Sequence, residues 1–396
     1  KTAQARFNEW SKLDDSERTT ESFVNAVNAD YFKLLDVLTI ARSRKHITKY
    51  YGADSGTFPT RRAPLAFNAP IDAAGELPPI AEPNDMIAQL TFAQYQVLSY
   101  VRHDRRSKYE ARYGDSWGKD FESQVRRTTA VANLMRVNVL KRMESSVNSF
   151  RITLQRILDG CLDLRGRLDN VGASVRYDAR AELGDFDDDD DAEEFAAGGK
   201  VAVDLRDVDI PKIAGDLDFD ITVLRRLLEY AAAVTPERDA KLIKLREFIT
   251  EKALNPYNPG NRKVLVFSAF ADTTDYLFNQ LAKSLKDELG LECAEVNGGT
   301  NRTYSLKLRH ASFENILAHF SPVSKELPDS EAVRGEIDVV FATDCISEGQ
   351  NLQDCDCLVN YDIHWNPVRI IQRFGRIDRL GSRNSQIQLV NFWPDI

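Results

Sequence analysis

The sequence lacks the features that mark several classes of protein. Its longest apolar runs, such as the one over 264–267, are far shorter than the roughly 18 residues that a membrane-spanning helix needs. Among its five cysteines, Cys355 and Cys357 have a single residue between them and no second pair of ligands, unlike a zinc site. We therefore expect reduced thiols, no resident metal site, no membrane partner and a cytoplasmic location.

The sequence also has no phosphate-binding loop of the form Gly-x-x-x-x-Gly-Lys-Ser/Thr and no Asp-Glu box for a magnesium ion. The glycines within 114–119 and 198–200 have the wrong spacing and no serine or threonine after the lysine. A complete site for hydrolysing a nucleoside triphosphate is therefore not encoded here. Because the sequence begins at Lys1 without a methionine, we expect it to be a piece of a longer protein.

The net charge of −9 gives little information about partners, because the acidic residues are unevenly distributed. Residues 185–194 hold eight carboxylates in ten positions without an apolar face, which is typical of a solvated, mobile loop. The rest of the chain is close to neutral. The acidic balance therefore does not exclude a nucleic-acid partner.

Changes of pattern divide the sequence into three parts. Residues 1–65 are rich in helix-forming residues and end in a basic stretch. Residues 66–235 begin with a proline-rich linker and continue as a helical insertion that includes the acidic run. Residues 236–396 alternate between strands and helices, which indicates an open α/β sheet with parallel strands. We therefore predict an α/β fold preceded by a mainly α-helical region.

The elements can be predicted from the spacing of apolar residues. From Leu134 to Ile157 they recur every three or four positions, which predicts one long helix. Its other face is basic and is either solvated or in contact with a nucleic acid: Arg136, Lys141, Arg142, Arg151 and Arg156. In the third part we predict, in chain order, a helix around 239–245, strand 263–268, helix 272–288, strand 292–296, helix 305–320, strands 337–342 and 357–361, helix 367–380 and strand 386–392.

An arginine-rich segment over 366–381 is predicted to be a helix with Asn366 as N-cap, Pro367 at its first position and Gly381 at its end. The residues expected to be buried are Ile370, Ile371, Phe374 and Ile377, and those expected on the opposite face are Arg369, Gln372, Arg376 and Arg379. Such a helix either exposes its arginines to solvent or binds carboxylates or phosphates with their planar forks.

The segments before this helix favour ligand binding. Thr343 and Asp344 directly follow a predicted buried strand, and Gly349 allows a close approach of the backbone. Asp362 follows the next strand. Because ligands of open α/β sheets bind at the carboxyl ends of strands, these polar residues indicate a binding edge.

Taken together, three segments resemble the second lobe of superfamily-two helicases, particularly the Swi/Snf-type translocases and their bacterial relatives. Residues 263–270 resemble helicase motif IV, residues 342–352 motif V and residues 372–379 motif VI. The resemblance covers about 236–396 and implies a RecA-like sheet. Residues 32–45 and 134–146 more weakly resemble the end of the first lobe and a helical insertion between the lobes.

The resemblance implies a role for each matching residue. Arg376 and Arg379 would be arginine fingers, and Gln372 would bind near the γ-phosphate. Asp344 would orient its motif, and the nucleotide side would be lined by Glu348, Gly349 and Gly375. Ser268 and Thr343 would contact the phosphate backbone of a nucleic acid, without reading its sequence.

The expected function is that of one motor lobe of an ATP-dependent nucleic-acid translocase. ATP and Mg²⁺ would be held mainly by a first lobe in the same parent chain, so this chain alone is expected not to hydrolyse ATP. DNA is the expected partner and RNA a possible one, with a nucleoid-associated location if the protein is bacterial. Two alternatives stay open: a non-enzymatic binding or docking module built on a helicase lobe, and an unrelated α/β enzyme such as a nucleotide-sugar transferase.

Overall fold

The computed structural model describes residues 44, 58–75, 81–117, 121–169, 174–177, 201–346, 350–364 and 366–394. The chain divides into two compact units, residues 1–57 and residues 58–396. Apart from residue 44, everything described here belongs to the second unit. The acidic run 185–194 and the two predicted nucleotide-side residues Glu348 and Gly349 lie outside the described residues.

The third part of the chain forms the predicted α/β sheet, with strands β5 (Val264–Phe267), β6 (Cys293–Val296), β7 (Asn301–Thr303), β8 (Val339–Ala342), β9 (Cys357–Asn360) and β10 (Gln386–Pro394). Their spatial order is β10-β9-β5-β8-β6-β7, and every pair is parallel except the antiparallel pair of β6 and β7. Strands β5, β6, β8 and β9 are fully buried, as expected for short apolar runs covered on both faces. The predicted fold class is confirmed.

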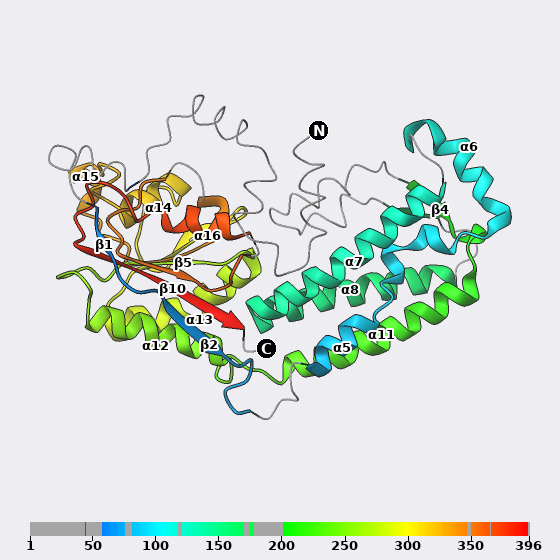
Figure 1. The fold of residues 1–396 in the computed structure, drawn as a ribbon, viewed down its shortest axis with the longest axis horizontal. Coiled ribbons are helices and arrows are strands. Elements are labelled where there is room, and N and C mark those ends of the chain that lie inside the picture. The colour runs from blue at the N-terminus through cyan, green and yellow to red at the C-terminus, as the bar shows by residue number, and fades with distance from the viewer. Residues whose placement is uncertain are drawn as a thin grey trace, which may run out of the picture. The chain divides into compact units, whose positions relative to one another are not determined.

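Helices cover both faces of this sheet (Figure 1). Val264 and Val266 of β5 pack with α12 (Ala240–Leu254) and α13 (Ala271–Leu289). Leu265 and Phe267 of the same strand point the other way, into the core that includes α14 (Phe313–Phe320) and Phe374 of α16 (Pro367–Phe374). This alternation follows from the two-residue period of a strand.

The edge of the sheet comes from an earlier part of the chain. Strand β1 (Thr60–Arg61) and strand β2 (Leu65–Ala69) both pair in parallel with β10. Shortly after β2, the buried Asp72 accepts two hydrogen bonds from Arg238, with N–O distances of 3.0 and 2.6 Å. Residues 60–69 thus belong to the same sheet as 264–394, although they lie on both sides of the predicted boundary at residue 65.

The second part is mainly α-helical, as predicted, with helices α5 (Ala81–Gln89), α6 (Arg106–Trp117), α7 (Phe121–Ser145), α8 (Val147–Leu168) and α11 (Ile210–Ala232). Strands β3 (Ser174–Tyr177) and β4 (Val201–Asp204) form an antiparallel pair. Helices α7, α8 and α11 share one apolar core. In the part of the chain that the structure describes, no helix is long and apolar enough to cross a membrane.

Two predicted helices differ from those observed. The long helix over 134–157 is interrupted at Ser146, whose extended backbone caps α8 and whose hydroxyl accepts a hydrogen bond from the Ser149 amide. The apolar residues keep a spacing of three or four across Ser146, so their pattern did not show that a new helix begins after this residue. The helix predicted over 305–320 begins only at Phe313, after Ser312 as N-cap.

Candidate functional site

The polar residues that follow β5, β8 and β9 lie at the same edge of the sheet, because neighbouring parallel strands end together. Arg373 of α16 lies at their centre and is fully buried. Its Nε atom lies 2.6 Å from Oδ1 of Asp344, and a second guanidinium nitrogen donates to the other carboxylate oxygen. The third nitrogen donates to Oδ1 of Asn360 at 3.1 Å and to the carbonyl of Asp362 at 3.3 Å. Arg373 thus joins the ends of β8 and β9.

This arrangement corrects the predicted orientation of α16. Arg373 is buried, whereas Ile371, predicted on the buried face, is 70% exposed. The helix also ends at Phe374, before the predicted end, although Asn366 caps its start and Pro367 begins it as expected. A bidentate ion pair with a carboxylate at a strand end offsets the cost of burying a guanidinium, so the apolar period did not decide the face.

Ser268 does not lie on the surface, as a contact with a nucleic-acid backbone would require. It is fully buried, and its hydroxyl donates to Oδ2 of Asp362 at 2.5 Å. The same carboxylate oxygen accepts a hydrogen bond from the Ser145 hydroxyl at 2.7 Å, so the end of α7 covers this edge. The predicted contact of Ser268 with a nucleic-acid backbone stays a prediction. Thr343, the other predicted contact, is only 6% exposed.

Polar contacts fix the corner between α7 and α8 against the sheet. The buried ammonium of Lys241 donates to the last carbonyls of α7, those of Glu144 and Ser145, at 2.8 Å each. Burial lowers the pKa of Lys241 to about 8. Arg142, predicted on a basic outer face, is instead buried and donates to Asp272 of α13 at 2.7 Å. The helical part thus docks on the sheet through buried polar groups that are hydrogen-bonded or ion-paired to one another.

The two predicted arginine fingers lie just after α16. Arg376 is 8% exposed, and its carbonyl accepts a hydrogen bond from the Leu352 amide. Arg379 is partly exposed, donates from Nε to the Gly375 carbonyl at 3.1 Å, and contacts the side-chain oxygen of Asn351. Burial lowers the pKa of Arg379, which nevertheless remains charged. Both arginines therefore lie beside the segment that leads out of the predicted motif V.

The only carboxylate within the predicted motif VI is bound by an arginine from a distant strand. Arg61 of β1 donates to Oδ2 of Asp378, with Nε at 2.7 Å, and lies over the Phe374 ring. Asp378 is therefore neutralised from outside the motif. No local pattern pointed to Arg61, because the pairing of β1 with β10 was not predicted.

Two other predicted residues lie beside these arginines. Gln372 is partly exposed, and its side-chain oxygen is buried without a hydrogen-bond partner among the described residues. Gly375 follows the last residue of α16, where an added Cβ would come within 3.3 Å of the Ile371 carbonyl. A side chain at Gly375 would therefore press on the helix end.

His364 is a feature of this edge that the sequence analysis did not single out. Its ring Nδ1 accepts a hydrogen bond from the Asn366 amide at 3.0 Å, beside the cap of α16. Burial, and then the nearby charge of Arg373, lower the pKa of His364 below its usual value. The imidazole is therefore held neutral, with its other nitrogen protonated.

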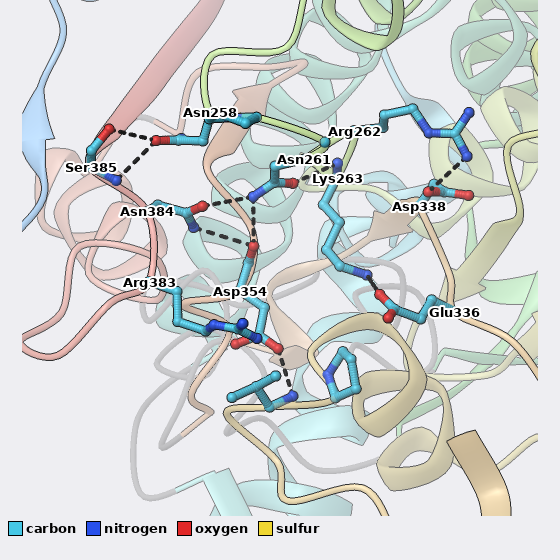
Figure 2. Close-up of a pocket in the computed structure, with 14 residues that line it drawn as sticks. Asn258, Asn261, Arg262, Lys263, Glu336, Asp338, Asp354, Arg383, Asn384 and Ser385 are labelled. Atoms are coloured by element: carbon cyan, nitrogen blue, oxygen red, sulfur yellow. Dashed lines mark hydrogen bonds and ion pairs between the residues drawn. The ribbon is translucent and has the colours of Figure 1, made fainter. Parts of the chain in front are cut away.

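At the opposite edge, where the parallel strands begin, the structure has a polar cavity of about 410 Å³ (Figure 2). Its amides are occupied by contacts between loops: Asn258 binds Ser385 and Gln386, and Asn261 binds Asn384 and the Asp354 carbonyl. Within the described residues, no group of three or more His, Cys, Asp or Glu side chains could hold a metal ion.

Comparison with known families identifies the α/β part. Residues 240–381 match the family model described as the helicase conserved C-terminal domain. This range includes Asp344, Arg373, Arg376 and Arg379. Over these residues, the α/β part of the chain is therefore similar to a helicase C-terminal domain.

The matches to curated relatives are local. The chain is 56% identical over 48 residues to "Uncharacterized ATP-dependent helicase YqhH" of Bacillus subtilis, covering 12% of this chain and 9% of that protein. It is 28% identical over 98 residues to "ATP-dependent RNA helicase DBP8" of Meyerozyma guilliermondii, covering 23% of each. The Pyrococcus furiosus Hef helicase domain is a structural neighbour with a TM-score of 0.41 and 15% identity, covering 97% of this chain and 63% of that one.

Proposed function

We propose that this chain provides the second motor lobe of an ATP-dependent, Swi/Snf-like translocase that acts on DNA. The observation that supports the proposal best is the position of Arg379, which lies beside Arg376 and next to the segment after β8, within the helicase C-terminal domain. In such a lobe these arginines complete an ATP site that a first lobe begins. The local matches to ATP-dependent helicases agree with this proposal.

The charges around the arginines fit a phosphate ligand. Asp344 is bound by Arg373 and Asp378 by Arg61. The side-chain hydrogen bonds of Arg379 go to a carbonyl oxygen and an amide oxygen, both neutral. A guanidinium with neutral partners keeps its full charge for an anion, and it binds phosphate oxygens well because of its planar donors.

ATP and Mg²⁺ would be held mainly by the first lobe. Bound ATP supplies a γ-phosphoryl group whose transfer to water drives movement, and Arg376 and Arg379 would stabilise the charge that develops on it. The exposed apolar side chains of Val368 (52%) and Ile371 (70%) fit a face of α16 that packs against this first lobe.

The proposal is tested with the full-length protein that contains this chain. We expect Arg379→Ala or Arg376→Ala to lower the nucleic-acid-stimulated rate of ATP hydrolysis by about 10³- to 10⁵-fold. Arg383→Ala is the control, because Arg383 is an exposed arginine that lies just after the predicted motif VI. The proposal fails if Arg379→Ala hydrolyses ATP at the wild-type rate.

One observation favours the alternative of a non-enzymatic nucleic-acid-binding or docking module. The corner between α7 and α8 covers Ser268 at the sheet edge, where a translocating strand would have to lie. A module of this kind would bind nucleic acid or a partner protein without ATP. If neither arginine variant changes ATP hydrolysis but both still bind duplex DNA like the wild type, the result will favour the non-enzymatic binding module.

A further inference from the structure

A tight turn after α14 holds one lysine in a fixed position. Over residues 321–327, the Ser321 carbonyl accepts a hydrogen bond from the Lys325 amide at 3.0 Å, and the Pro322 carbonyl accepts one from Leu327 at 2.8 Å. Glu326, which follows the lysine, has a φ of +51°, a left-handed conformation that non-glycine residues rarely adopt. Backbone strain of this kind persists only where surrounding contacts hold it.

The contacts that hold this turn come from Asp354, on the segment between β8 and β9. Its carboxylate accepts hydrogen bonds from the amides of Val323 at 2.7 Å and Ser324 at 3.1 Å, and from the Ser324 hydroxyl. The Asp354 carbonyl is in turn fixed by the Asn261 side chain (Figure 2). The turn is therefore built onto the core of the lobe and positions Lys325 before any ligand binds.

Lys325 lies next to the proposed arginine finger. Its ammonium donates to the side-chain oxygen of Gln350, and Arg379 donates to the side-chain oxygen of the adjacent Asn351. Both cations are partly buried. Two charged side chains, one from the turn and one from the segment after α16, thus converge on consecutive residues.

The charge of this pair is not balanced locally. Among the residues that the structure describes, no carboxylate forms an ion pair with Lys325 or Arg379. Burial and the charge of Arg379 both lower the pKa of Lys325, while the exposed Glu314 opposes this shift. Two like charges held together by neutral amides cost free energy that an anion between them would recover.

We propose that Lys325 and Arg379 form a two-cation site for phosphate, with Lys325 as an additional ligand-binding residue outside the three helicase motifs. The proposal deepens the proposed function and rests on it for Arg379. The phosphate would belong either to the terminal groups of a nucleoside triphosphate or to a nucleic-acid backbone, and each source is tested with its own probe.

The test titrates the 1–396 chain with tripolyphosphate and, separately, with a duplex DNA oligonucleotide over a range of salt concentrations. We expect Lys325→Gln to weaken tripolyphosphate binding about fivefold, the effect of losing one partly exposed charged hydrogen bond. Lys325→Arg should retain binding, because it keeps the charge. Lys283→Gln, at an exposed lysine of α13, is the matched control and should bind like the wild type.

The outcomes separate the two sources and the two proposals. If the backbone is the source, Lys325→Gln will instead lower the slope of log affinity against log salt for DNA by about 0.9. If Arg379→Gln weakens binding and Lys325→Gln does not, this inference is overturned while the proposed function stands. If the wild-type chain binds neither probe, or neither variant changes binding, the phosphate site is overturned.

Discussion

The ion pair between Asp344 and Arg373 offers the most direct test of how this lobe is held together. Both side chains are nearly excluded from solvent, at 8% and 0% exposure. Removing one partner of a buried pair leaves an uncompensated charge and costs about 3–5 kcal/mol. Arg373→Met also leaves Oδ1 of Asn360 without its arginine donor, which adds about 1–3 kcal/mol where no water replaces it. Asp344→Asn keeps the shape of the side chain but turns an amide donor toward the guanidinium.

We therefore expect Arg373→Met to lower the free energy of unfolding more than Asp344→Asn, with both losses near or above about 3 kcal/mol. Urea unfolding of the 1–396 chain, monitored by circular dichroism, would measure these losses as changes in midpoint at a constant slope. The double variant should lose less than the sum of the single losses, because it leaves no unpaired charge.

A surface pair provides the control. Asp163 and Arg167 are exposed and four residues apart on α8, so Arg167→Gln should cost at most about 0.5 kcal/mol. The reasoning is refuted if either buried substitution costs less than about 1 kcal/mol, or if the two losses add without coupling. In that case water or rearranged neighbours must replace the pair, and Arg373 would not be what joins the two strand ends.

Two further predictions concern neighbouring groups. Ser145→Asp places a second carboxylate beside that of Asp362, and we expect faster amide exchange at the end of α7 and the start of α8. Asn133→Asp, at an exposed position of α7, is the control and should leave this exchange unchanged. Unchanged exchange in Ser145→Asp would contradict the docking of this corner on the sheet. The lowered pKa of His364 means that the unfolded state binds more protons, so stability should fall as pH drops from about 7 through the unfolded value of about 6.5. His364→Gln should flatten this part of the stability profile, and an unchanged slope in this variant would count against a partly buried imidazole that is neutral in the folded state.

The strands of the lobe could be predicted because the sheet is buried on both faces. Short, wholly apolar runs such as 264–267 are typical of strands that are buried on both faces of a sheet, and the polar turns between them marked where each strand ends. The clustering of Thr343 and Asp344 at the end of β8 also followed from this reasoning. The apolar runs did not predict that β2 pairs with β10 at the edge of the sheet. Strand β2 is mostly exposed, and the paired residues lie more than 300 positions apart in the sequence.

The site itself was predicted less well, for a physical reason that α16 illustrates. Apolar periodicity assumes that the buried face of a helix is the apolar one. Here the neighbouring strand end presents a carboxylate, and a bidentate pair with Arg373 stabilises a charged buried face. Ile371 is displaced to the surface as a consequence. Which of two adjacent faces is buried was therefore decided by a tertiary contact that no local pattern contains.

The same contact separates the arginines of this segment by role. The helical period of the sequence places Arg369, Arg376 and Arg379 on one face, but it does not show which arginines have carboxylate partners. In the structure, Asp344 holds Arg373, and the remaining carboxylate, Asp378, is held by Arg61. These two carboxylates are thereby occupied, and the hydrogen-bond acceptors that the described residues offer to Arg379 are neutral. Under the proposed function, the buried pair and the distant strand would do more than stabilise the lobe, because they would leave Arg379 available to an incoming phosphate.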